Sequence, residues 1–142
     1  MTVYFTVPGE PEGKARPRVT SHGTYTPAKT RVYEQAVRIA YRQHCGTADF
    51  GTRPLSVCIR AYFKIPDSAA KRQRERMLSD KTFPAKKPDA DNIAKSVLDA
   101  LNGIAYRDDA QVIRLDVVKY WDTSPRVDVW ITDDITQQGV QP

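Results

Sequence analysis

The chain has 142 residues, which fits one compact domain and leaves little room for a second. Its 22 Lys and Arg residues outnumber its 17 Asp and Glu residues, and the resulting net charge of +5 favours an anionic partner. Two cysteines are too few for a disulfide framework or a zinc site, and no apolar run approaches the ~18 residues of a membrane span. We therefore expect a cytoplasmic protein that does not bind a membrane. We also expect no small-molecule cofactor.

The first part of the chain contains a predicted strand, a loop and a helix. Apolar and polar residues alternate over residues 2–7, which predicts the strand. Residues 9–25 are rich in Gly and Pro and are expected to form a long loop. Thr26 then suits a helix N-cap, with Pro27 at the first position of a helix over residues 27–44.

The middle of the chain combines a clear strand with a basic segment. Residues 55–63 show the most regular alternation of apolar and polar side chains in the sequence, which predicts a strand. Residues 67–88 are strongly basic and hold few large apolar side chains. Within this segment residues 69–78 could form one short helix, and we expect the remainder to be mobile.

The last part of the chain contains a second helix and two strands. An apolar stripe predicts the helix over residues 91–102. Alternating residues predict strands over 113–117 and 127–131, joined as a hairpin. The order is strand, helix, strand, helix, strand, strand. We therefore predict an α+β fold, with helices packed on a small mixed sheet, as a single domain over residues 1–133 followed by a polar tail over 134–142.

Aspartates are concentrated on and after the second predicted helix, in a chain that is otherwise positive. Carboxylates repel phosphates, so a protein that only binds nucleic acid has no use for such a cluster unless cations lie between the two. The combination predicts metal-dependent chemistry on a polyanion. The members of the cluster are Asp89, Asp91, Asp99, Asp108 and Asp109.

The spacing allows several of these acids to meet. Asp91, Lys95 and Asp99 follow one another at intervals of four residues and share one face of the helix. The helix from Asp91 rises ~16 Å, while the link to Asp109 reaches ~23 Å when extended, so Asp109 can return to the start of the helix. Asp89 lies just before the helix and can converge on the same point.

A carboxylate site without His or Cys is suited to Mg²⁺ or Mn²⁺ rather than to zinc. The expected chemistry is phosphodiester hydrolysis, in which the metal activates a water and neutralises the charge that develops at phosphorus. Lys95 could stabilise that charge or position the water. The sequence does not choose between one ion and two.

The same residues also have structural interpretations. Asp89 or Asp91 can cap the helix, Asp91 can form an exposed ion pair with Lys95, and Asp108 with Asp109 can form a turn before a strand. Under this interpretation the protein is a basic DNA-binding module without enzymatic activity. A third possibility is a metal-dependent nuclease acting on flaps, linear duplex or RNA, because carboxylate chemistry alone does not select the substrate.

The segment PDADNIAKSVLDALNG, followed by DDAQV, resembles the signature of the RusA family of Holliday junction resolvases. The matching positions are Asp89, Asp91, Asn92, Lys95, residues 98–101 and residues 108–112. The N-terminal loop is similar as well, through Gly9, Pro11, Lys14, Arg16, Pro17 and Arg18. The resemblance spans most of residues 3–120, and the basic segment and the tail match only loosely.

The resemblance implies a homodimeric, Mg²⁺-dependent endonuclease that resolves four-way DNA junctions by paired symmetric nicks in recombination and repair, in bacteria or in their phages or prophages. It implies that Asp89, Asp91 and Asp109 bind the metal and that Lys95 is catalytic. Asp108 either binds metal or shapes the turn. Asp99 matches the pattern too, but it lies ~12 Å along the helix from Asp91, so we expect a structural role or support for a second site.

Basic residues outside the acidic cluster are expected to hold the DNA through its phosphates. They are Lys14, Arg16 and Arg18 in the N-terminal loop, and Lys71, Arg72, Arg74, Arg76, Lys86 and Lys87 in the basic segment. The alternative for the loop residues is a dispersed, solvated charge patch. Phe83 could stack on an opened base at the crossover or pack against its own protein. Nothing resembles a helix that reads base edges, so binding selective for DNA structure rather than for sequence is expected.

Overall fold

A computed structural model describes residues 1–25 and 27–136 of the chain, with side chains except at positions 18 and 25. Thr26, the predicted N-cap, and residues 137–142 of the predicted tail lie outside these described residues, and the division of the chain at residue 133 stays a prediction. The described elements are β1 (Thr2–Pro8), β2 (Arg18–Thr20), β3 (Gly23–Tyr25), α1 (Ala28–Cys45), β4 (Leu55–Lys64), α2 (Lys71–Leu78), α3 (Ala90–Ala100), the short 3-10 helix η1 (Asp109–Gln111), β5 (Val112–Asp122) and β6 (Arg126–Thr132).

Four strands form a mixed sheet in the order β1-β6-β4-β5. β4 pairs antiparallel with β6 and parallel with β5, and β1 pairs antiparallel with β6. The predicted α+β class with a small mixed sheet is therefore confirmed. The strands predicted over 2–7 and 55–63 and the helices over 69–78 and 91–102 correspond to β1, β4, α2 and α3.

The predicted hairpin between the last two strands is wrong, because β4 lies between β5 and β6. β4 is the most apolar strand, and neighbours on both of its edges satisfy the backbone groups that its burial removes from water. Strands two places apart are separated by about 10 Å, a distance that the three residues after Asp122 can span. This link passes the end of β4, where the Ile65 N–H donates to the Asp122 carbonyl at 3.0 Å.

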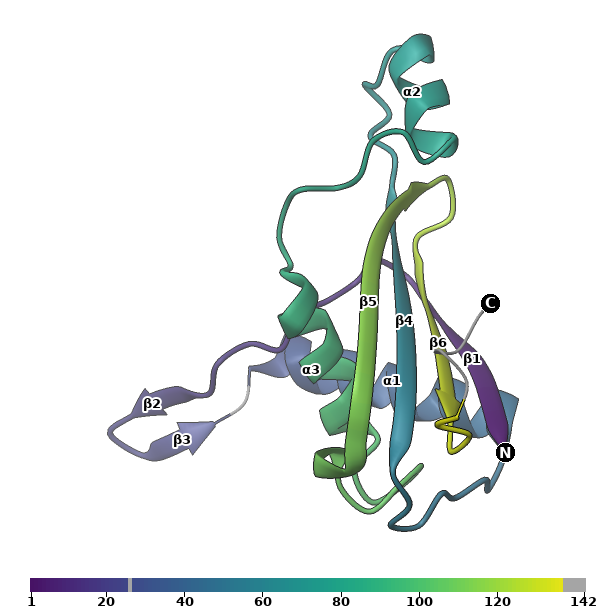
Figure 1. Ribbon diagram of the computed structural model, residues 1–142. Helices are drawn as coiled ribbons and strands as arrows, with labels where there is room; N and C mark the ends of the chain where they lie inside the picture. Colours follow the sequence, from purple (N-terminus) through teal and green to yellow (C-terminus); the bar gives the residue numbers. More distant parts are fainter. Residues whose placement is uncertain (26, 137–142) are drawn as a thin grey trace.

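Helices α1 and α3 cover one face of the sheet and contact each other (Figure 1). The inward-facing side chains of the strands pack against the apolar stripes of both helices. The core includes Phe5, Val7, Val37, Tyr41, Val57, Ile59, Ile93, Val97, Leu101, Val129 and Ile131. As the stripe predicts, α3 buries Ile93, Ala94 and Val97 and leaves Asp91 and Lys95 exposed.

Residues 9–25 are not loop throughout, because β2 and β3 form a separate two-stranded hairpin. Gly23 holds a φ of +118° at the turn, a conformation that favours glycine. The Thr20 hydroxyl closes the turn by donating to the Gly23 carbonyl and accepting from the His22 N–H. The hairpin projects from the body of the domain, and α2 projects on another side (Figure 1).

Among the described residues, no helix combines the length and apolar character that crossing a membrane requires.

Helix α1 begins one residue later than predicted, with Pro27 as its N-cap rather than its first helical residue.

Candidate functional site

Asp89 and Asp91 lie at the N-terminal end of α3, with exposed side chains. Asp89 is the N-cap by backbone position, and its carbonyl accepts from the Ile93 N–H at 3.0 Å, but its side chain makes no capping hydrogen bond. Lys95 pairs with Asp99, at 3.4 Å, rather than with Asp91. Within the described part of the chain, these two carboxylates therefore neither cap the helix nor form an ion pair with Lys95.

Asp109 lies at the opposite end of α3, where its N–H donates to the Asn102 side-chain oxygen at 2.9 Å. Burial raises the pKa of the Asp109 carboxyl, the neighbouring Asp99 and Asp108 carboxylates raise it further, and Lys95 opposes them. Asp99 and Asp109 therefore form a second group of acids, two helical turns beyond Asp91.

The expected meeting of Asp89, Asp91 and Asp109 is not found: across residues 1–25 and 27–136, no three His, Cys, Asp or Glu side chains come together closely enough to hold a metal ion. The link before Asp109 is folded rather than extended, because it buries Tyr106 in the core. The Tyr106 hydroxyl donates to the Leu98 carbonyl at 2.7 Å. The residues between α3 and Asp109 are therefore folded into the core, and the ~23 Å that they could span when extended was only an upper limit.

Asp108 shapes the turn that carries Asp109. Its carboxylate accepts from the Ala110 N–H at 3.0 Å, while its own N–H donates to the Gln111 side-chain oxygen, also at 3.0 Å. This is a capping box around η1. Gln111 also donates to the carbonyls of Gly51 and Arg53, which fixes the turn against the loop before β4.

Lys14 is bound inside the protein instead of standing free for phosphate. Its Nζ atom lies 2.5 Å from Glu34 on α1 and 3.5 Å from Asp99 on α3, and only 19% of its side chain is exposed. Burial works against the charged form of Lys14, but the Glu34 and Asp99 carboxylates outweigh it and raise its pKa. Arg38 lies 3.4 Å from Glu34. We call the series Arg38, Glu34, Lys14, Asp99 and Lys95, in which positive and negative side chains alternate, the charge chain.

A hollow of about 370 Å³ lies beside Asp89, and its lining includes three lysines and two acidic residues. Sequence reasoning missed Lys29 and Glu12, which form an ion pair at 3.4 Å here, because nothing in their local pattern marks them. The N-terminal loop reaches the hollow by close packing, since a Cβ at Gly13 would lie 3.0 Å from the Cβ of Pro88. The lining residues are Glu12, Gly13, Lys14, Lys29, Lys87, Pro88, Asp89 and Asn92.

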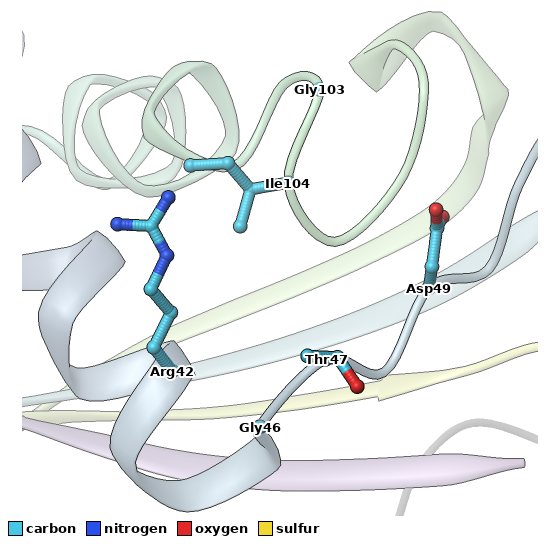
Figure 2. A pocket seen from close by; sticks show the side chains of 6 residues that line it. All are labelled: Arg42, Gly46, Thr47, Asp49, Gly103 and Ile104. Atoms are coloured by element: carbon cyan, nitrogen blue, oxygen red, sulfur yellow. The ribbon is translucent and has the colours of Figure 1, made fainter.

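A roomier hollow of about 450 Å³, shown in Figure 2, lies at the C-terminal end of α1. Arg42 and Ile104 line one side and Asp49 the other. The Asp49 carboxylate is already engaged by the Gly51 N–H at 2.8 Å. None of the side chains predicted to act in the site lines this hollow, so its size does not make it the functional site.

The remaining predicted DNA contacts lie on the two projecting elements and on the segment that leads to α3. Lys71, Arg72 and Arg76 are exposed on α2, whereas Arg74 donates to the Pro66 carbonyl. Arg16 is exposed before the hairpin, and the side chain of Arg18 lies outside the described residues. Lys87 is exposed, and the Lys86 ammonium lies over the rings of Phe63 and Trp121, at 5.5 and 5.6 Å from their centroids.

Phe83 packs against its own protein, and its stacking on an opened base stays a prediction. Its ring centroid lies 5.9 Å from that of Tyr120, so it contacts its own protein, and 52% of the residue remains exposed.

Fold and site together define a small α+β domain in which one helix carries acids at both ends and basic elements project around it. This distribution of charge is typical of enzymes that act on phosphate esters in polyanions.

Comparison with known proteins gives the particular family. The family described as endodeoxyribonuclease RusA matches residues 8–132, so the chain belongs to the RusA family, as its aspartate motif indicates. The chain is also similar to the uncharacterized protein YqaN of Bacillus subtilis (strain 168). The two are 35% identical over 137 residues, which cover 92% of this chain and 96% of the relative. Family membership points to an endonuclease that acts on DNA.

Proposed function

We propose that this protein is a structure-selective endodeoxyribonuclease that resolves Holliday junctions by paired, symmetric nicks, as a homodimer, in DNA recombination and repair. Membership of the RusA family supports the endonuclease activity and the branched substrate. The observation that carries the proposal is the state of Asp89 and Asp91. Their exposed carboxylates neither cap the helix nor pair with Lys95, and Asp89 borders a hollow whose lining includes three lysines.

The residues that would hold divalent cations, Mg²⁺ with Mn²⁺ as a substitute, are Asp89 and Asp91 at the N-terminal end of α3 and Asp109 at its opposite end, so Asp109 would bind an ion separate from that of Asp89 and Asp91. The donors fit in chemistry, because all are carboxylates and hard cations prefer oxygen ligands. They also fit in number, because Mg²⁺ often takes only one or two carboxylates and fills its remaining positions with water and substrate phosphate. When bound, the cation would supply an activated water and neutralise charge on the phosphate. Asp108, already a cap, is the weaker candidate ligand.

Lys95 is the proposed catalytic cation supplied by the protein itself. It lies between the two groups of acids on α3, and 60% of its side chain is exposed. A fixed ammonium at this place can stabilise the negative charge that develops on the phosphate oxygens. The lysines of the hollow, Lys29 and Lys87, would hold the phosphates of the same strand, and the basic residues of α2 and Arg16 would hold neighbouring arms of the DNA.

The decisive experiment is strand-mapped cleavage of a synthetic four-way junction by the parent and by Asp91→Asn in Mg²⁺. Outer-shell partners of a metal contribute 10–100-fold to activity, so we expect loss of a ligand to reduce the nicking rate by at least ~100-fold. Junction binding without divalent cations should be unchanged or tighter, because one negative charge is lost. Asp67→Asn is the matched control, since this side chain is 91% exposed.

Equal nicking rates for Asp91→Asn and the parent would contradict the proposal. Equal rates on a junction and on a linear duplex of the same length would indicate a general metal-dependent nuclease. A parent that nicks neither DNA, and whose fold is not stabilised by Mg²⁺ or Mn²⁺, would instead be a DNA-binding module.

A further inference from the structure

Asp99 lies between two lysines from distant parts of the sequence. Its Oδ2 atom is 3.5 Å from the Lys14 ammonium and 3.4 Å from the Lys95 ammonium. The side chains of Lys14 and Asp99 are 19% and 21% exposed, whereas that of Lys95 is 60% exposed. The Asp99 Oδ2 atom thus pairs with the largely buried Lys14 on one side and with the exposed Lys95 on the other.

The inner part of the charge chain is firmly anchored. Glu34 binds Lys14 at 2.5 Å and Arg38 at 3.4 Å, and the Arg38 Nε atom donates to the carbonyl of Ala100 at 3.1 Å. The series therefore begins at Arg38 on α1, which is bonded to the last residue of α3, and ends at Lys95 on α3. Partial burial strengthens such pairs relative to exposed ones, because less water screens the charges.

The backbone around Lys14 is fixed as well. The Lys14 N–H donates to the Asn92 carbonyl at 3.1 Å, and the Ala15 N–H donates to the Thr30 hydroxyl at 3.2 Å. The Glu12 carbonyl accepts from Ser96 at 2.9 Å. The Lys14 ammonium therefore reaches Asp99 from a loop that is bonded to both helices.

The partner that Lys95 takes is not the one that helix geometry favours. Asp91 and Asp99 both lie four residues from Lys95, and in isolated helices an acid that precedes the lysine forms the better pair. Lys95 nevertheless pairs with Asp99. Asp109, beside Asp99, adds a second negative charge at that end of the helix.

We propose that Asp99, held in place by Lys14, is a positioning residue that keeps the Lys95 ammonium away from Asp91, so that the Asp91 carboxylate stays available to a divalent cation. This inference rests on the proposed function, which gives Asp91 and Lys95 their roles. Without the Asp99 charge, Lys95 turns back one helical turn and pairs with Asp91, where it competes with the cation.

The test is Mn²⁺ binding to the DNA-free protein, followed by electron paramagnetic resonance, for the parent and four variants. Asp99→Asn should weaken Mn²⁺ binding about 10-fold, the lower end of the range for residues that act on a metal through its ligands. Asp99→Glu should restore binding, because it keeps the charge. Asp99→Asn combined with Lys95→Met should also restore binding, because the competing ammonium is gone, yet junction nicking should stay lost. Asp67→Asn should bind Mn²⁺ like the parent.

The double variant separates positioning from general damage to the fold, since a merely structural role for Asp99 predicts no recovery when Lys95 is also removed. A parent that binds no Mn²⁺, an Asp99→Asn variant that binds it as tightly as the parent, or a double variant without recovery would each overturn the inference. If the Mn²⁺ results are as expected but the parent nicks no junction, the proposed function fails and the positioning role of Asp99 stands.

Discussion

Replacing Lys14 with Met tests whether the charge chain stabilises the fold. Met keeps most of the apolar stem but removes the ammonium that lies 2.5 Å from Glu34 and 3.5 Å from Asp99. The Glu34 side chain, 11% exposed, then keeps Arg38 as its ion-pair partner. An exposed pair contributes about 0–1 kcal/mol and breaking a buried pair costs about 3–5 kcal/mol, so this intermediate burial predicts a loss of about 2 kcal/mol.

Urea unfolding measures the loss. With a typical slope of about 1–3 kcal/mol per molar urea, the midpoint should fall by roughly 1 M. A double-mutant cycle with Glu34→Gln isolates the pair, and Lys64→Met, which removes an exposed ammonium 4.0 Å from Asp67, is the control. A loss below about 0.5 kcal/mol for Lys14→Met, with no coupling to Glu34, would refute the reasoning. Because the pKa of Lys14 is raised on folding, the contribution is complete below the unfolded value of about 10.4 and is lost only as the pH rises through the folded value.

The same variant decides between the internal role of Lys14 and the phosphate contact expected from the sequence. Removing a lysine that binds a phosphate lowers the dependence of log affinity on log salt by about 1. Fluorescence anisotropy of a labelled junction without divalent cations should show no such change for Lys14→Met. Lys29→Met removes a lysine that is 78% exposed in the hollow beside Asp89, and should show it. A smaller salt dependence of log affinity for Lys14→Met than for the parent would instead support the phosphate contact expected from the sequence.

Two further substitutions test the geometry around α3. Asp109→Asn should raise the melting temperature at pH 7 and abolish nicking. The pKa of Asp109 is raised on folding, so its ionised carboxylate destabilises the fold at neutral pH, and this destabilisation is lost only as the pH falls through the folded pKa. A lower melting temperature for Asp109→Asn would contradict the repulsion between Asp109 and Asp99. Gly13→Ala should lower the free energy of unfolding, measured with urea, by about 1–3 kcal/mol. The added Cβ would lie 3.0 Å from the Cβ of Pro88 and 3.2 Å from that of Asn92. An unchanged urea midpoint would mean that the N-terminal loop packs less closely against Pro88 and Asn92 than these distances indicate.

Local patterns were sufficient where one face of an element decides its structure. The alternation over 55–63 and the stripe over 91–102 correspond to β4 and α3 because each buries one side against the same core. Strand pairing was not readable in this way. The alternation in β5 and β6 predicts two strands, but it does not show that β4 separates them or that Ile113 and Leu115 stay exposed on β5. The β2–β3 hairpin was missed because each of its strands has only three residues, too few to show a period.

The site was predicted in composition but not in arrangement. The spacing of Asp91, Lys95 and Asp99 placed them on one helix face, and the structure agrees. The pairing of Lys14 with Asp99 joins residues that are 85 positions apart, and no local pattern encodes such a contact. For Asp109, the extended reach of the link ignored the apolar residues within it, and burial of Tyr106 took up the length.

The acids of α3 differ in how the protein neutralises them, and this difference accounts for an acidic cluster in a basic chain. Asp99 is matched by Lys14 and Lys95, so its charge is balanced internally. Asp89 and Asp91 have exposed carboxylates that none of the ion pairs within the described residues includes. Close to DNA, an unmatched carboxylate repels phosphate, and a divalent cation between the two reverses the sign of that interaction. Under the proposed function, the carboxylates that the protein leaves unmatched are therefore the ones that a cation and the DNA phosphate together would neutralise.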